Sequence, residues 1–186
     1  KNIYDFGGNY LTFLDLKKKL YFKNKFSKKY IIHNPFLSKN EEKILKLNKI
    51  KFTRNFNVLD LTKMDLLMFN SVLHYIEDSN DFIKQYLNFF SNNVKFILIT
   101  DTRFALKKKF SLLDKKHNHI IYYKRKNYLI NILKKKFELL FESSLENTNQ
   151  KYEFKNLLFA SNKNYFKSWR IKSLNDFSFL SLLDLI

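Results

Sequence analysis

Several residue types are absent or rare in this sequence, and each absence excludes certain kinds of site or classes of protein. The 186 residues include no cysteine, which excludes disulfide bonds and thiolate metal sites within the chain. No apolar run approaches the roughly 18 residues that a membrane-spanning helix needs, and no signal peptide opens the chain. We therefore expect a cytoplasmic protein without a transmembrane segment.

The chain also lacks an initiator methionine and begins one residue before a predicted strand. We expect that it is a piece of a longer protein whose N-terminal part is missing. An apolar fraction of 45% allows a packed core, and neither a repeat nor a linker is visible. We predict one domain over 1–160, followed by a C-terminal tail, 161–186, whose packing the sequence does not define.

Arginine is scarce although the chain is strongly basic. The net charge is +18, yet only four of the 35 basic residues are arginine. Proteins that read nucleic acid favour arginine for bidentate contacts. Lysine, asparagine, phenylalanine, isoleucine and tyrosine are abundant, which is typical of the products of A/T-rich genes. A solvated lysine-rich surface therefore explains the charge better than a nucleic-acid partner does, and we do not expect such a partner.

Short apolar strands alternate with amphipathic helices along the chain. Strands are predicted at 2–6, 29–33, 50–53, 64–69, 94–100, 137–142 and 152–160, with helices at 9–20, 38–47, 79–90 and 128–136 and a poorly patterned stretch at 104–123. Ser38 and Glu41 have the spacing of a capping box. The alternation predicts an α/β fold with a mostly parallel sheet and helices on both faces.

In such a sheet, ligands bind where the order of the strands reverses, beyond their carboxyl ends. The residues expected there are Gly7, Gly8, Asn34, Asn55, Asn70, Ser71, Asp101 and Arg103. Gly7 and Gly8 are the only glycines in the chain, and they fall where the first strand turns into a helix. Glycine permits a positive φ and a close approach of the backbone to a ligand. The pair is not a complete G-x-G-x-x-G motif, so an ordinary tight turn remains the alternative.

Two segments carry a resemblance to a known family. The sequence Ile3-Tyr4-Asp5-Phe6-Gly7-Gly8 and the later run at 64–78, with Asp65, Ser71 and His74, resemble the two hallmark blocks of the LIC12133 family of S-adenosylmethionine-dependent methyltransferases. The resemblance covers 2–103 well and the rest loosely. It implies a Rossmann-like class I methyltransferase sheet with an antiparallel last strand, S-adenosylmethionine as the cofactor, and a small-molecule or glycan-type acceptor.

The resemblance also implies roles for single residues. Asp5, Gly7 and Gly8 would line the methionine and ribose side of the cofactor. Asn34 stands where such proteins carry an acidic residue for the ribose diol, so it lacks the stronger charge-assisted bond. The adenine would lie against Asn55 and Phe56, and the transferable methyl would lie above Asn70 and Ser71.

Three further side chains have less defined roles. His74 replaces the usual glutamine of the second block and is a candidate general base, or else a histidine at a helix entry or on the surface. Arg103 is a candidate for holding an acidic acceptor, or else an ion-pair partner of Asp101. His117 and His119 lack a third ligand, so we predict no metal site.

Three functions follow from these observations. The first is methyl transfer from S-adenosylmethionine to a hydroxyl of a glycan-type or other small acceptor. In-line positioning supplies much of the catalysis in such a reaction, so the lack of an obvious catalytic pair does not count against it. The second is a methyltransferase-like binding or scaffolding domain without catalysis, which the loss of the acid at Asn34 favours. The third, nucleic-acid binding, rests on the net charge alone.

Overall fold

A computed structural model describes residues 2–21, 29–115, 118–145 and 151–161 of the chain. Five parallel strands form one half of its central sheet in the order β3-β2-β1-β4-β5. Their bounds are β1 Asn2–Phe6, β2 Lys29–His33, β3 Lys51–Thr53, β4 Met64–Asn70 and β5 Val94–Ala105. The order of the strands reverses between β1 and β4, as the sequence predicts.

The other half of the sheet is antiparallel. The last strand, β9 (Tyr152–Ser161), lies between β5 and β8 (Phe137–Leu145) and runs antiparallel to both. The predicted antiparallel last strand is therefore confirmed. The predicted tail at 161–186 lies outside the described residues, apart from Ser161, which ends β9.

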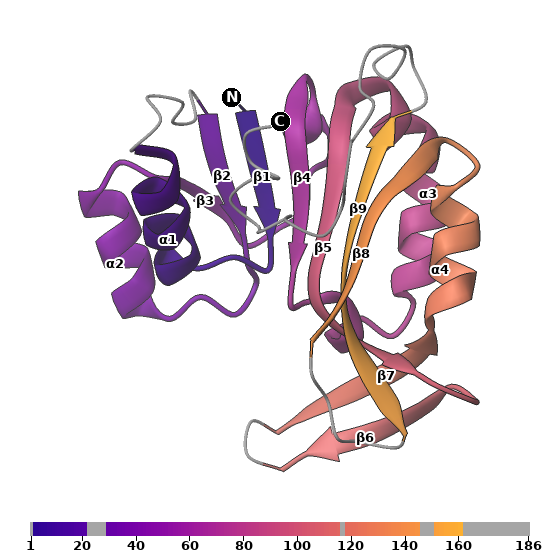
Figure 1. The fold of residues 1–186 in the computed structure, drawn as a ribbon. Coiled ribbons are helices and arrows are strands. Elements are labelled where there is room, and N and C mark those ends of the chain that lie inside the picture. The colour runs from indigo at the N-terminus through magenta and orange to yellow at the C-terminus, as the bar shows by residue number, and fades with distance from the viewer. Residues whose placement is uncertain (1, 22–28, 116–117, 146–150, 162–186) are drawn as a thin grey trace.

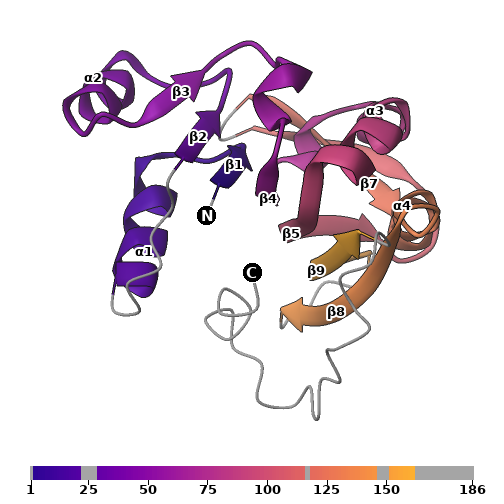
Figure 2. The same cartoon turned by 90° about the horizontal axis from the view of Figure 1, so that it is seen from above.

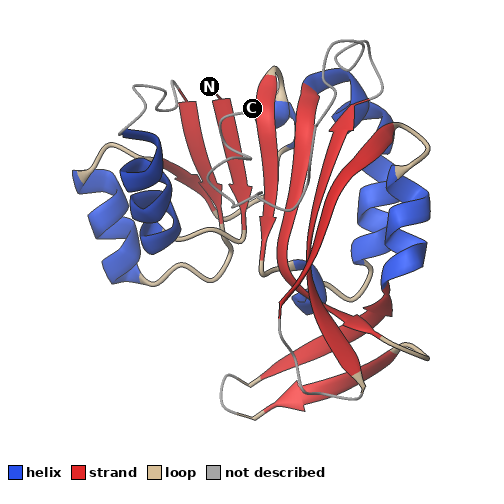
Figure 3. Ribbon diagram, in the orientation of Figure 1, coloured by secondary structure: helices blue, strands red, loops and turns tan. Residues whose placement is uncertain are grey.

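Helices cover both faces of the sheet (Figures 2 and 3). They are α1 Tyr10–Tyr21, α2 Lys39–Leu47, α3 Ser79–Asn93 and α4 Lys126–Leu133. One core cluster joins α3 and α4 to the sheet, and a second cluster joins α1 and α2 to the opposite face. Because both faces are covered, β4 and β5 read as nearly continuous apolar runs.

Local signals in the sequence set several of the boundaries. The capping box is present at the start of α2, where the Ser38 hydroxyl accepts a hydrogen bond from the Glu41 amide. A cap of this kind stabilises a helix by about 1 kcal/mol. At the start of α1 the side chain of Asn9 accepts a hydrogen bond from the Thr12 amide at 3.0 Å.

The structure corrects the prediction for the region after β5. This strand does not end near Thr100 but continues to Ala105 after an irregularity at Asp101, whose φ is +47°. The poorly patterned stretch at 104–123 contains a hairpin made of β6 (Phe110–Asp114) and β7 (His119–Arg125). Strand β7 pairs with the end of β5, and in Figure 1 the hairpin lies beyond the carboxyl ends of the parallel strands.

Candidate functional site

The glycine pair lies at the carboxyl end of β1, beside the point where the strand order reverses. Gly7 has a φ of +88°, and its amide donates to the carbonyl of His33 at 2.7 Å. A Cβ on Gly7 would lie 2.6 Å from the Cβ of Val72 and 2.9 Å from the carbonyl oxygen of Asn70. The loop is therefore wedged between the ends of β2 and β4, and no other residue type fits at Gly7 without strain.

Asp5 lies directly beneath this loop. Its carboxylate is fully buried, and Oδ2 accepts a hydrogen bond of 2.6 Å from the hydroxyl of Tyr30, while Oδ1 has no partner among the described residues. Burial raises the pKa of Asp5 to about 7, and the hydrogen bond from Tyr30 acts in the opposite direction. A Cβ on Gly8 would lie 2.0 Å from Oδ2 of Asp5. Asp5 therefore supports the loop from below.

Asn70 holds three elements together at the reversal of strand order. Its amide nitrogen donates to the Thr12 hydroxyl of α1 at 3.0 Å, and its amide oxygen accepts from the Thr100 hydroxyl of β5 at 2.9 Å. Ser71 follows it with a φ of +51°, and its amide donates to the carbonyl of Thr100. The sequence predicts Asn70 and Ser71 as residues of the site but does not predict Thr12 and Thr100. Only their hydroxyl groups, one in the first turn of a helix and one at a strand end, could have pointed to them.

Both the amide nitrogen and the amide oxygen of Asn34 form hydrogen bonds within the protein. Its amide nitrogen donates to the carbonyl of Gly8 at 3.1 Å, and its amide oxygen accepts from the backbone N–H of Phe36 at 2.9 Å. Asn34 thus ties the end of β2 to the glycine loop. This geometry explains why an amide stands here, because a carboxylate could not donate to the Gly8 carbonyl.

Phe56 joins an aromatic cluster beyond β1, β2 and β3. Its ring centroid lies 5.7 Å from that of Phe6, 5.9 Å from that of His33 and 5.0 Å from that of Phe82. Such edge and tilted contacts fix the rings relative to one another. The neighbouring Asn55 is exposed, and its carbonyl accepts a hydrogen bond from Thr53. The two residues of the predicted adenine region therefore differ: one packs inward and the other faces outward.

His74 lies in the short 3-10 helix η2 (Leu73–Tyr75) that follows β4. It is only 2% exposed, and neither ring nitrogen has a hydrogen-bond partner among the described residues. Burial, together with the nearby charges of Arg103 and Lys124, lowers the pKa of His74 to about 3. The interpretation as a surface histidine is therefore wrong, whereas the position ahead of α3 agrees with a histidine at a helix entry. A pKa this low disfavours the role of general base near neutral pH.

Arg103 lies within β5, beyond the irregularity at Asp101. Its guanidinium carbon lies 5.2 Å from the centroid of the Phe154 ring, and Arg103 contributes to the pKa of Tyr123 on β7. The structure shows no ion pair between Arg103 and Asp101 in the part of the chain it describes. The interpretation of Arg103 as the ion-pair partner of Asp101 is therefore not supported.

The β6–β7 hairpin reaches back toward the loops after β2 and β4. His119, at the start of β7, has its ring 5.3 Å from that of Phe36 and 6.0 Å from that of Tyr75, between centroids. Phe36 follows Asn34, and Tyr75 follows His74 in η2. The hairpin thus joins two loops that flank the glycine pair, which the sequence did not predict.

A cavity of about 640 Å³ lies between the hairpin and the first turn of α3. Its walls include Asp78, Asp81, Tyr122, Lys124 and Arg125, but none of the residues of the glycine loop. Lys124 spans this region, because its ammonium donates to the carbonyl of Ile76 and to the hydroxyl of Ser79. The cavity therefore lies next to η2 and apart from Gly7 and Gly8.

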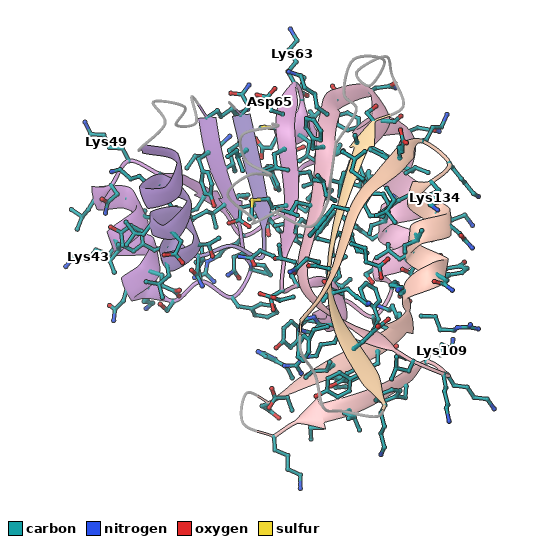
Figure 4. All side chains as sticks on the ribbon, viewed as in Figure 1. Lys43, Lys49, Lys63, Asp65, Lys109 and Lys134 are labelled. Atoms are coloured by element: carbon teal, nitrogen blue, oxygen red, sulfur yellow. The ribbon has the colours of Figure 1, made fainter. Side chains whose placement is uncertain are left out.

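Exposed lysines of the described part extend from more than one side of the structure. Figure 4 shows Lys43, Lys49, Lys63, Lys109 and Lys134 pointing outward from different sides. Within the described ranges, no three histidine, aspartate or glutamate side chains are placed to hold a metal ion. No helix of the described part is long and apolar enough to cross a membrane.

The fold of this chain is similar to that of several solved structures. No protein-family model matches the chain, and no curated protein matches it in sequence. Among solved structures, it is similar to the N-terminal domain of EvdMO1 with SAH bound, with a TM-score of 0.61 and 9% identity over 87% of this chain and 74% of that one. The same domain was also crystallised in the presence of SAH and D-fucose.

Two further structures have the same arrangement. A SAM-dependent methyltransferase from Methanosarcina mazei aligns with a TM-score of 0.56 and 12% identity, over 86% of this chain and 92% of that one. The N-methyltransferase NodS from Bradyrhizobium japonicum, in complex with SAH, aligns with a TM-score of 0.55 and 12% identity, over 88% of this chain and 79% of that one. The chain therefore has the Rossmann-like fold of class I methyltransferases, as the sequence predicts.

Proposed function

We propose that this protein is a methyltransferase that uses S-adenosylmethionine and methylates a hydroxyl of a small, glycan-type acceptor. The observation that carries the proposal is the glycine loop. Gly7 and Gly8 lie at the carboxyl end of β1, beside the reversal of strand order, where open α/β sheets bind their ligands. SAH is bound in the similar EvdMO1 domain, which supports the choice of cofactor, and that domain was also crystallised in the presence of D-fucose, which is the reason for choosing a sugar-type acceptor.

The residues of the loop fit the cofactor. Because neither glycine has a Cβ, the loop packs closely against Val72 and Asp5 and turns directly into α1. The start of a helix in this position can hold polar or anionic groups of a ligand. Asn34 and Asn70 keep this backbone in place by hydrogen bonds to Gly8 and Thr12. S-adenosylmethionine supplies an electrophilic methyl group on a positively charged sulfur.

The main contribution of the protein to methyl transfer is to align the acceptor with the methyl donor. The acceptor oxygen must lie on the line that extends the bond between sulfur and methyl, and holding it there removes an entropic part of the barrier. The positive φ at Ser71 and the contact of Val72 with Gly7 fix the loop after β4 against the glycine loop. We assign Asn70 and Ser71 to the wall beneath the methyl group, and η2 to the acceptor side.

His74 is not suited to act as a general base, because it is buried and its pKa is lowered to about 3. When the methyl group passes from sulfur to the acceptor oxygen, the hydroxyl proton leaves to water or to another base, and the ring of His74 is available only as a hydrogen-bond partner. We therefore expect an acceptor hydroxyl that loses its proton without strong activation by the protein.

A second candidate is a methyltransferase-like binding domain without catalysis. The observation that favours it is the commitment of the Asn34 amide to the Gly8 carbonyl and the Phe36 N–H, which leaves no carboxylate for the ribose diol at that position. A domain of this kind would transfer no methyl group, whether or not it binds the cofactor.

Calorimetric titration with S-adenosylmethionine and S-adenosylhomocysteine distinguishes the two candidates. The methyltransferase proposal predicts one site per chain for each ligand. If neither ligand binds at millimolar concentration, the methyltransferase proposal is wrong. If S-adenosylhomocysteine binds but no methyl group reaches any member of a panel of hydroxylated sugars and sugar acids, the noncatalytic candidate is favoured.

A further inference from the structure

Arg103 is held rigidly at the carboxyl end of the sheet. One face of its guanidinium lies over the ring of Phe154, its direct neighbour across the β5–β9 pair, and Tyr123 on the adjoining β7 is close enough for Arg103 to influence its pKa. A guanidinium stacked in this way loses little entropy when it binds a further group. The side chain is thus prepared for a partner rather than extended into solvent.

No carboxylate neutralises this guanidinium in the part of the chain that the structure describes. The closest acidic neighbour in register is Glu153, beside Phe154, but its carboxylate pairs with Lys126 at 3.6 Å and Lys155 at 3.1 Å. The Nε atom of Arg103 is buried and has no hydrogen-bond partner there either. A half-buried positive charge with an unused donor is costly unless a ligand completes it.

The imidazole of His74 adds two more unused polar atoms to the same place. The short helix η2, which carries His74, packs against β5, which carries Arg103. Both ring nitrogens of His74 lack partners among the described residues. A neutral imidazole offers one donor and one acceptor. Buried polar groups that a protein leaves unpaired indicate an absent ligand or water.

These groups lie beside the loop that would hold the methyl donor. Val72 contacts Gly7 directly, and η2, which carries His74, follows Val72 immediately. Tyr75 and Tyr123, with Phe110 and Tyr152, pack into a small aromatic cluster around the same strands. The strand that carries Arg103 therefore packs against η2, which we assigned to the acceptor side.

We propose that the acceptor of this protein carries an anionic group, a carboxylate or a phosphate, that binds the guanidinium of Arg103 and accepts a hydrogen bond from the ring of His74. The inference rests on the proposed function, because it identifies the chemical class of the acceptor. It adds a requirement that hydroxylated but uncharged sugars do not meet.

The small number of arginines allows a direct test by NMR. The chain has only four, so the Nε–H signal of Arg103 can be assigned by its loss in the variant Arg103→Gln. Inorganic phosphate and benzoate are titrated separately at constant ionic strength into the whole chain, with and without S-adenosylhomocysteine. The Nε–H signal of Arg103 should shift with at least one anion, and the response should saturate.

Two variants make the test specific. Arg103→Gln should weaken binding of the responding anion by about tenfold or more, as expected for a charge-assisted hydrogen bond. Lys108→Gln removes an equal charge from an exposed position after β5 and should leave the affinity within about twofold. Circular dichroism verifies that both variants are folded, and Arg103→Lys replaces Arg103→Gln if the latter is not.

The outcomes separate the two proposals. Saturable binding of phosphate or benzoate that depends on Arg103 supports the anionic acceptor and shows which anion is preferred. No shift of the Arg103 signal with either anion, or equal affinity in the wild type and the variant, overturns it even when S-adenosylhomocysteine binds normally. Failure of S-adenosylhomocysteine to bind instead contradicts the proposed function, whatever the anions do.

Discussion

The carboxylate of Asp5 lies so close beneath Gly8 that a Cβ at Gly8 would be 2.0 Å from its Oδ2 atom. Asp5 cannot easily move aside, since it is fully buried and accepts a 2.6 Å hydrogen bond from Tyr30. The two residues are therefore coupled, and the shape of the glycine loop depends on both.

Gly8→Ala should destabilise the protein by about 1–3 kcal/mol, as overpacking in a tight core does. In the background of Asp5→Ala the same change should cost less, because the carboxylate that clashes is gone. The difference is a coupling energy of at least about 0.5 kcal/mol, measured from urea unfolding of the wild type, both single variants and the double variant.

Asp5→Asn is the matched control for that cycle, because it removes the charge but keeps the atoms beneath Gly8. In this background Gly8→Ala should cost as much as in the wild type. Equal costs in all three backgrounds would contradict the close contact between Asp5 and Gly8.

The buried carboxyl group of Asp5 should also make stability depend on pH. Its pKa is raised to about 7 in the folded protein, so between the ordinary value of 3.8 and about 7 the folded state holds a proton that the unfolded state has released. The free energy of unfolding should then fall as pH rises from about 4 to 7, by at most about 4 kcal/mol from this group.

Asp5→Asn isolates this contribution, because the other titrating groups are common to both proteins. The stability of the wild type relative to Asp5→Asn should decrease steadily between pH 4.5 and 7.5 in urea unfolding experiments. A relative stability that is constant or increases over that interval would mean that Asp5 is ionised in the folded state.

The sequence predicts much of this fold because its core strands are apolar on both faces. The run at β4 and the capping box of Ser38 and Glu41 locate their elements closely. The β6–β7 hairpin was missed because it lies at the surface, where Leu112, Leu113 and Ile120 are exposed and give no clear alternation.

The site was predictable in position but not in detail. The ends of the strands follow from hydrophobic patterning, so Gly7, Asn34 and Asn70 fall at one edge of the sheet as expected. Their partners do not follow from patterning. The hydrogen bond from Asn34 to Gly8 and the burial of His74 depend on contacts between segments distant in sequence.

Asn34→Asp tests whether this residue is structural. The change introduces the acid expected at the end of β2 but removes the donor to the Gly8 carbonyl, so it should destabilise the protein by about 1–3 kcal/mol. Asn34→Ala removes that hydrogen bond and also the one from the Phe36 N–H, so it should destabilise the protein as well, without adding a charge. Thermal unfolding at pH 7 measures both.

Titration of S-adenosylhomocysteine into Asn34→Asp can contradict the structural role of Asn34. If this variant is as stable as the wild type and binds S-adenosylhomocysteine more tightly, the Asn34 amide is not needed for the loop. The position would then serve the ribose diol alone.

His74 should stay neutral through the physiological range. Burial and the charges of Arg103 and Lys124 lower its pKa to about 3. The C2–H proton signal, assigned by its loss in His74→Gln, should keep the chemical shift of the neutral form from pH 8 to pH 5. A titration midpoint within this range would restore His74 as a candidate base.

The binding of the cofactor at the glycine loop is tested most directly by the glycines themselves. Because Gly7 and Gly8 are the only two in the chain, a protein labelled with 15N-glycine gives two backbone amide signals from this loop. Titration with S-adenosylhomocysteine should shift both signals and saturate at one ligand per chain. Signals that stay unchanged at millimolar ligand would contradict a methyl-donor site at Gly7 and Gly8.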